Sequence, residues 1–294
     1  MKVLMTGCNG QLGQSVTKEM RHKDFQLFSF SKENLDITNI NDLTATIEKL
    51  KPHFLLNTAA YTSVDGAEKN KEIALRINQH GSKNLGIVSK KYNLPIIHFS
   101  TDFVFDGKSK VPYAPTSKTN PINVYGQSKL LGEKEILEHS DNFIIIRTSW
   151  VFSEFGNNFL KSIAKNILAG KKLHVISDQY GRPTYAGDIA KLVIQIISTT
   201  QDCQLPNSIL HYAGNSTVSW YEFAKEIHDQ SLEVETFKSI ALNNKIRAIS
   251  TSEYSNALAL RPSFSALDSK KIMSLYAMPP SNWKDRIKAC LEQL

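Results

Sequence analysis

A tyrosine and a lysine four places apart, Tyr125 and Lys129, are the side chains of this sequence best suited to proton transfer. Tyrosine has an ordinary pKa of about 10, so it exchanges protons reluctantly at neutral pH unless a neighbouring cation stabilises the phenolate. A lysine one helical turn away lies on the same helix face and can supply that charge. The pair could therefore act as a general acid for a carbonyl group that receives a hydride.

The spacing alone is weak evidence, because the chain has ten tyrosines and many lysines and repeats the spacing at Tyr221 and Lys225. The second pair lies in "SWYEFAKEI", whose apolar stripe is typical of a helix that faces a core. The first pair follows "HFSTDFVFDG", where an apolar strand ends at the hydroxyls of Ser100 and Thr101. Such a hydroxyl at the carboxyl edge of a parallel sheet faces the ligand crevice. We therefore interpret the first pair as functional and the second as structural.

Three glycines, Gly7, Gly10 and Gly13, follow the first predicted strand and open a helix in "TGCNGQLG". A dinucleotide site needs this context, with a tight turn, a backbone close to the pyrophosphate and a helix N-terminus facing its charge. The spacing Gly-x-x-Gly-x-x-Gly differs from the common Gly-x-Gly-x-x-Gly fingerprint. The glycines could serve the turn alone, but their place at the first strand and helix junction favours a nucleotide role.

The second predicted strand ends in "FSFSKEN", so Ser31 and Lys32 stand where an acidic side chain commonly holds the ribose 2′-hydroxyl of NAD. Without that acid a 2′-phosphate meets less repulsion, which predicts NADPH as cofactor and leaves NADH as an alternative. Asp36 could meet the edge of the adenine, with Ile37 against its face. These residues could also be ordinary loop residues.

Short apolar runs alternate with helical patterns through the first half of the chain, for example a helix over residues 69–90. The apolar runs are nearly continuous, so both faces of their sheet should be covered by helices. The pattern predicts an α/β fold with a Rossmann-type doubly wound parallel sheet. Residues 1–150 are predicted to form the NAD(P)-binding domain and residues 151–294 a smaller mixed α/β substrate domain. Some elements of 171–200 are expected to return to the first sheet.

Composition excludes several classes of protein. Hydrophobic residues make up 41% and charged residues 21%, which excludes a disordered or fibrous chain. The net charge of +7 comes from scattered lysines without a basic block, so we expect no nucleic-acid partner. No stretch is apolar enough for a signal peptide or a membrane span, which predicts a cytoplasmic protein with no membrane partner. The three cysteines are far apart and the histidines lack ligand spacing, so no metal is predicted.

A series of segments with family-like patterns is spread along nearly the whole chain: "GCNGQLG", "NTAAYTSVDGAE", "STDFVFDG", "PINVYGQSKLLGE", "RTSWVF", "FGNNF", "VISDQYGRPTY" and "RPSFSALD". In this order the series resembles the extended short-chain dehydrogenase/reductases and, within them, the dTDP-4-dehydrorhamnose reductases. The resemblance implies a monomer or homodimer that uses NAD(P)H to reduce the C4 keto group of dTDP-4-dehydro-β-L-rhamnose, in the last step of dTDP-L-rhamnose synthesis for surface polysaccharide.

The resemblance also implies roles for individual residues. In the implied catalytic triad Tyr125 protonates the sugar oxygen, Thr101 orients it and Lys129 keeps Tyr125 acidic. The cofactor positions, with Ser31 added from the pattern above, are Gly7, Gly10, Gln11, Leu12, Ser31, Asp36, Ile37, Ala59, Ala60, Tyr61, Asn78, Tyr125 and Lys129. The substrate positions are Thr62, Val64, Thr101, Phe103, Trp150, Asn158 and Arg261, where Trp150 would lie against the sugar and Arg261 would meet the diphosphate.

Some of these positions have simpler explanations or depart from the family pattern. Trp150 ends an apolar strand and could belong to the core, and Asn158 could cap the following helix. Phe103 stands where the family commonly has tyrosine, which bears on the choice of substrate. Ser15 and Gly187 stand where some relatives hold a metal with carboxylates, which again predicts no metal.

Three rival functions remain. Sugar-nucleotide 4,6-dehydratases share the tyrosine and lysine pair but need an Asp-Glu pair after the threonine, whereas here Asp102 is followed by Phe103. The chain could instead reduce another 4-keto-6-deoxy nucleotide sugar, or act as a non-catalytic NADP-binding regulatory subunit. Because Thr101, Tyr125 and Lys129 are all present, an enzyme is favoured over a regulatory subunit.

Overall fold

A six-stranded sheet forms the centre of the computed structural model, which describes residues 1–21, 23–254 and 257–294. Every neighbouring pair of strands is parallel, in the order β10-β5-β4-β3-β1-β2. The strands are β1 (Lys2–Thr6), β2 (Gln26–Phe30), β3 (Phe54–Asn57), β4 (Ile96–Thr101), β5 (Phe143–Thr148) and β10 (Ser208–His211). The predicted Rossmann-type doubly wound sheet is confirmed. The strand order reverses between β1 and β3, where such sheets bind ligands at their carboxyl ends.

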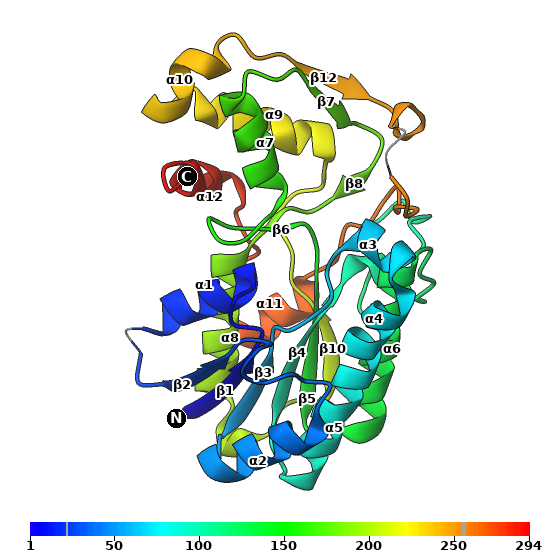
Figure 1. Cartoon of the computed structure of the whole chain (residues 1–294), viewed down its shortest axis with the longest axis vertical. Helices are drawn as coiled ribbons and strands as arrows, with labels where there is room; N and C mark the ends of the chain where they lie inside the picture. Colours follow the sequence, from blue (N-terminus) through cyan, green and yellow to red (C-terminus); the bar gives the residue numbers. More distant parts are fainter. Residues whose placement is uncertain (22, 255–256) are drawn as a thin grey trace.

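Helices cover both faces of this sheet (Figure 1). Alternate residues of a strand point to opposite faces, so Val3 and Met5 join one core cluster and Leu4 joins another. The first cluster is completed by α1 (Gln11–Met20), α8 (Ala186–Thr199) and α11 (Lys270–Tyr276), and the second by α2 (Ile40–Leu50), α5 (Gly81–Lys91) and α6 (Val124–His139). All residues of β3, β4 and β5 are buried, which explains their continuous apolar runs.

The helix predicted over residues 69–90 is interrupted. It consists of α4 (Lys71–Leu75), a π-helical turn (Arg76–His80) and α5, and it follows the short helix α3 (Val64–Lys69). The π-helical turn brings the carbonyl of Asn78 so close to α6 that a β-carbon at Gly132 would overlap it. Nothing in the amphipathic pattern distinguishes this turn from the helices on either side of it.

The later half of the chain forms a second cluster of elements at the carboxyl edge of the sheet (Figure 1). Its core includes Phe152, Phe223 and Trp283. Its elements are β6 (Val151–Phe152), α7 (Phe159–Leu168), β7 (Leu173–Ile176), β8 (Tyr180–Gly181), β9 (Thr184–Tyr185), β11 (Val218–Ser219), α9 (Trp220–Ser231), α10 (Glu235–Ala241), β12 (Ile246–Ile249) and α12 (Lys284–Leu291).

The predicted domain division at residue 150 stays a prediction. Elements that follow residue 150 also join the main sheet and its helices. Helix α8 packs against α1, and β10 pairs with β5 at the edge of the main sheet. Within the described residues, no helix combines the length and apolar character that crossing a membrane requires.

A buried ion pair fixes α6 against β5. Glu133 of α6 accepts two hydrogen bonds from the guanidinium of Arg147 in β5, Nε to Oε1 at 2.8 Å and Nη2 to Oε2 at 2.7 Å. Both side chains are at most 3% exposed, and the guanidinium also lies over the ring of Phe105. Burying two charges is costly unless both are fully paired, so each side chain depends on the other.

Removing one partner should therefore destabilise the protein more than removing both. We expect Arg147→Met to lower the free energy of unfolding by about 3 to 5 kcal/mol, because Glu133 is left buried and unpaired. The double variant Arg147→Met, Glu133→Leu should recover much of this loss. Urea unfolding of Arg147→Met, Glu133→Leu and the double variant measures the three free energies of unfolding. A double variant no more stable than Arg147→Met would contradict the account.

Candidate active site

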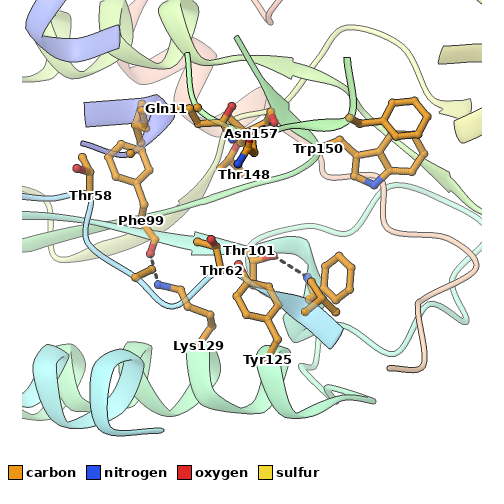
Figure 2. A pocket seen from close by; sticks show the side chains of 18 of the residues that line it. Gln11, Thr58, Thr62, Phe99, Thr101, Tyr125, Lys129, Thr148, Trp150 and Asn157 are labelled. Carbon is orange, nitrogen blue, oxygen red and sulfur yellow. Dashed lines mark hydrogen bonds between the residues drawn. The ribbon is translucent and has the colours of Figure 1, made fainter. Parts of the chain in front are cut away.

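A cavity of about 1120 Å³ opens at the carboxyl ends of β1, β3, β4 and β5, between the main sheet and the later elements. Its lining joins the glycine loop to the start of α6 and to residues of α7, β7 and α9. Figure 2 shows part of this lining, with Tyr125 and Lys129 projecting from one helix towards the end of β4. The cavity is thus where the sequence predicts chemistry.

The glycine loop is shaped for close approach to a ligand. Gly7 has a φ of +76°, which favours glycine, and a β-carbon there would overlap the backbone of Ala59. Gly10 stands at the N-cap of α1 and has no side chain to cap the helix. The first N–H groups of α1 are therefore available to an anion such as a pyrophosphate.

Tyr125 lies in the first turn of α6, pressed against the end of β4. The helix begins after Asn123, whose Oδ1 accepts a hydrogen bond from the Gly126 N–H at 2.7 Å. A β-carbon at Gly126 would overlap the carbonyl oxygen of Phe103, so a glycine here lets the two segments meet. The Phe103 ring contacts Tyr125 edge-on, with ring centroids 5.6 Å apart. The local sequence "VYGQ" thus brings the phenol beside Thr101.

Lys129 is buried beneath the cavity, and its Nζ donates a hydrogen bond to the carbonyl oxygen of Phe99 at 2.7 Å (Figure 2). Burial lowers the pKa of Lys129 to about 8, although the charge of Glu133 acts in the opposite direction. The ammonium therefore lies in a place where its charge is poorly compensated. An anion formed nearby would be stabilised by it.

The phenol of Tyr125 is buried, and its surroundings favour the protonated form. The pKa of Tyr125 is raised to about 12, mainly by burial; hydrogen bonding with Thr101 partly offsets this rise, and the charge of Asp102 adds to it. The phenol is consequently neutral at physiological pH and keeps a proton that it can donate. The ammonium of Lys129 is directed at a backbone carbonyl, and its role in keeping this phenol acidic stays a prediction.

Three buried polar atoms of the cavity lining lack a hydrogen-bond partner within the described part of the chain: Ser100 Oγ, Asp102 Oδ2 and Thr148 Oγ1. The other carboxylate oxygen of Asp102 accepts a hydrogen bond from Thr101 at 3.1 Å, and burial raises the pKa of Asp102 to about 7. Buried polar atoms are rarely left unpaired, so these three fit polar groups of a bound molecule. Together with the glycine loop they suit a nicotinamide dinucleotide.

Two tryptophans form part of the cavity lining beyond β5. Trp150 and Trp220 stack with ring centroids 3.5 Å apart and an interplanar angle of 7°. Trp150 has a φ of +48°, which is a strained backbone conformation for a bulky residue. Such backbone strain is concentrated at functional sites. The apolar stripe that includes Trp220 predicts a core residue, and nothing in this stripe reveals that the ring also reaches the cavity.

Most of the predicted site residues line the cavity. Their roles in binding and catalysis stay predictions. The second pair lies elsewhere, since Tyr221 packs against the later core and Lys225 is exposed. The predicted residues that line the cavity are Gly7, Gly10, Gln11, Leu12, Asp36, Ile37, Ala59, Ala60, Thr62, Val64, Thr101, Phe103, Tyr125, Lys129, Trp150 and Arg261.

Four described residues predicted to contact a ligand are not part of the lining: Ser31, Tyr61, Asn78 and Asn158. Ser31 is buried and its hydroxyl engages Glu33. The amide of Asn78 holds the backbone of Tyr61, accepting from its N–H at 2.8 Å and donating to its carbonyl at 3.0 Å. Asn158 caps α7 by accepting a hydrogen bond from the Lys161 N–H, which is the alternative role that the sequence offers for it. These side chains shape the walls around the cavity.

Other lining residues were not predicted as site residues. They come from distant parts of the chain, and no local spacing links them to the motifs. Phe99 and Thr148 could have been suggested by their place near strand ends, as Ser100 is by its place beside Thr101, whereas the others carry no such signal. The others include Leu35, Thr58, Ile77, Asn157, Phe159, Asn166, His174, Trp220 and Tyr254.

The prediction that the chain holds no metal stays a prediction. Within the described residues, the group of histidine and acidic side chains close enough to share an ion is Glu135, Glu138 and His139. It lies on α6 outside the cavity lining.

Comparison with known proteins assigns the family. The RmlD substrate binding domain family matches residues 1–294. The chain belongs to this family. The dTDP-4-dehydrorhamnose reductase of Aggregatibacter actinomycetemcomitans is 38% identical over 289 residues, which cover 98% of this RmlD chain and 97% of that protein. The spore coat polysaccharide biosynthesis protein SpsK of Bacillus subtilis (strain 168) is 32% identical over 292 residues, 99% of this chain and 97% of SpsK.

Solved structures of the RmlD family agree with the fold. The crystal structure of dTDP-4-dehydrorhamnose reductase from Bacillus anthracis str. Ames in complex with NADP has a TM-score of 0.87 and 30% identity. The match covers 98% of this chain and 97% of that one. The resemblance inferred from the sequence is confirmed, and the chain is a full-length homologue of the RmlD-family reductases.

The lowered pKa of Lys129 predicts a pH-dependent stability. The pKa of Lys129 in the folded state, about 8, lies below the ordinary 10.5, so burying the ammonium lowers the free energy of unfolding. This destabilisation is complete below pH 8, and it disappears as the pH rises towards 10.5. Relative to Lys129→Met, the wild type should gain about 2 kcal/mol of unfolding free energy between pH 8 and 10. Urea unfolding at both pH values measures this, and parallel pH profiles would contradict the buried ammonium.

Proposed function

We propose that this chain reduces the C4 keto group of dTDP-4-dehydro-β-L-rhamnose to dTDP-L-rhamnose, with NADPH as cofactor and NADH as an alternative. The observation that carries the reaction type is the neutral, buried phenol of Tyr125 beside Thr101 and Lys129, at the sheet edge where the glycine loop opens. The substrate is supported by relatives named dTDP-4-dehydrorhamnose reductase at 30 to 38% identity over nearly the full length.

The cofactor would be held by groups of the first half of the chain. The N-terminus of α1 and the loop at Gly7 suit the pyrophosphate, and Asp36 and Ile37 suit the adenosine. Lys32 lines the same end of the cavity and suits a 2′-phosphate. When bound, the reduced nicotinamide supplies a hydride to the substrate.

The protein's own part of the reaction is proton transfer. A ketone becomes an alcohol by gaining a hydride at carbon and a proton at oxygen, and Tyr125 donates that proton. An alkoxide is a stronger base than a phenolate, so a phenol with a pKa of about 12 is still acidic enough for this step. Thr101 holds the sugar oxygen by a hydrogen bond. The lowered pKa of Lys129 indicates that its buried ammonium is poorly compensated by negative charge. The phenolate that forms on Tyr125 supplies this counter-charge.

Reduction of another 4-keto-6-deoxy nucleotide sugar is the second candidate. It is favoured by Phe103, which lines the cavity without the hydroxyl that a tyrosine at this position would offer to the sugar. SpsK, named for spore coat polysaccharide biosynthesis, also indicates that relatives at this identity carry other names. The experiment that separates the candidates is NADPH oxidation followed by absorbance, with each keto sugar nucleotide in turn and the product checked by mass. Turnover restricted to a different sugar would overturn the proposed substrate.

The reaction type predicts the behaviour of Tyr125→Phe. This substitution keeps the ring against Phe103 but removes the proton, so kcat should fall by roughly a hundredfold to ten-thousandfold. The dissociation constant of NADPH, measured by fluorescence, should stay unchanged.

The matched control is Tyr221→Phe, which removes a phenol from the other Tyr-x-x-x-Lys pair, outside the cavity lining. It should keep its rate. If Tyr125→Phe kept its rate as well, Tyr125 would not be the proton donor.

A further inference from the structure

A segment of the later half, residues 257–262, is tied to helix α3 beside the cavity. We call this segment the strap. Asp65 of α3 accepts hydrogen bonds from the backbone N–H groups of Leu258 at 3.1 Å and Ala259 at 3.0 Å. Its other carboxylate oxygen accepts one from Arg261 Nη2 at 2.8 Å. Figure 1 shows the orange segment that contains the strap passing beside α3. One carboxylate therefore holds both the backbone of the strap and its cavity-lining guanidinium.

The same helix also holds the start of α6. Glu68 of α3 accepts a hydrogen bond from the Val124 N–H at 2.9 Å. Asn123 caps α6 through its Oδ1 and donates from its Nδ2 to the carbonyl of Leu260 in the strap at 2.7 Å. Tyr125 follows within two residues. The strap and the phenol are thus fixed to one another through a short polar network.

We propose that Asp65 is a positioning residue that holds the guanidinium of Arg261 at the cavity, where it binds the diphosphate of the nucleotide-sugar substrate. This inference rests on the proposed function. A guanidinium has five N–H donors, and one of them goes to Asp65. The remaining fork matches two phosphate oxygens. A long side chain that is already ordered loses less entropy when the ligand binds.

The carboxylate of Asp65 could instead weaken diphosphate binding by neutralising the charge of Arg261. Positioning of the guanidinium strengthens this binding, so the two effects oppose each other. Both side chains are partly exposed, at 26% for Arg261 and 37% for Asp65, so solvent screens the attraction between their charges. Two of the three hydrogen bonds to Asp65 come from the backbone of the strap, and these are independent of the arginine's charge. Positioning therefore outweighs neutralisation.

The test is the variant Asp65→Asn, whose amide oxygen can still accept from the strap backbone but which no longer pairs as an anion with Arg261. Thymidine 5′-diphosphate is titrated into the NADP⁺-bound protein and binding is followed by calorimetry. We expect about tenfold weaker binding and a similar rise in KM for the keto sugar, with kcat and the NADPH dissociation constant unchanged.

A double-mutant cycle separates positioning of Arg261 from a general structural effect. Arg261→Lys removes the planar fork and should itself weaken diphosphate binding. Adding Asp65→Asn to Arg261→Lys should then weaken it no further. The control is Asp178→Asn, because Asp178 also accepts a backbone N–H and a hydroxyl, those of Thr251, but lies outside the cavity lining. It should leave diphosphate binding unchanged.

Each contrary outcome has a distinct meaning. Unchanged or tighter diphosphate binding by Asp65→Asn, in a protein that still reduces the sugar, overturns the positioning role and leaves the proposed function standing. Further weakening on the Arg261→Lys background also overturns it, because Asp65 would then act through something other than Arg261. A wild-type protein that neither binds thymidine diphosphate nor reduces the sugar overturns the inference together with the proposed function.

Discussion

The hydrogen bond from Lys129 to the carbonyl of Phe99 connects α6 to the central sheet, and the arrangement of the site depends on it. It holds α6 against β4 at the level where that strand ends in Thr101. Tyr125, one turn earlier on α6, is thereby placed beside the threonine. Because a backbone carbonyl is a weak partner for a buried ammonium, the charge of Lys129 stays poorly compensated. It is therefore available to the phenolate that the proposed proton transfer from Tyr125 would create. One contact therefore serves both geometry and electrostatics.

Burial is the common cause behind the protonation of the site. It raises the pKa of Tyr125 to about 12 and of Asp102 to about 7, and it lowers that of Lys129 to about 8. The later half of the chain, with Trp150 and Trp220, helps to enclose the groups that these shifts concern. The strap that carries Arg261 is hydrogen-bonded to Asn123 at the N-terminus of α6 and to Asp65 of α3. The element that would hold the substrate's diphosphate is therefore fixed to the helix that carries the proposed proton donor.

The fold and the centre of the site could be predicted because their signals are local. Continuous apolar runs revealed β3, β4 and β5, and the position of Tyr125 and Lys129 after a strand ending in Thr101 singled them out. What escaped prediction depends on contacts between distant segments. Nothing in "FLKSIAK" distinguishes an Asn158 that caps a helix from one that meets a ligand, and no spacing links Asp65 to Arg261. The ring of Trp220 belongs to an apolar stripe whether it faces core or cavity.

The central claim is that this site transfers a hydride to the C4 carbon of a keto sugar nucleotide. Its most direct test is to supply NADPH carrying deuterium at both C4 positions together with dTDP-4-dehydro-β-L-rhamnose, and to locate the label in the product by mass and NMR. The account predicts one deuterium, bound to C4 of the sugar, in dTDP-L-rhamnose. A product without deuterium, or with deuterium at another carbon, would contradict it.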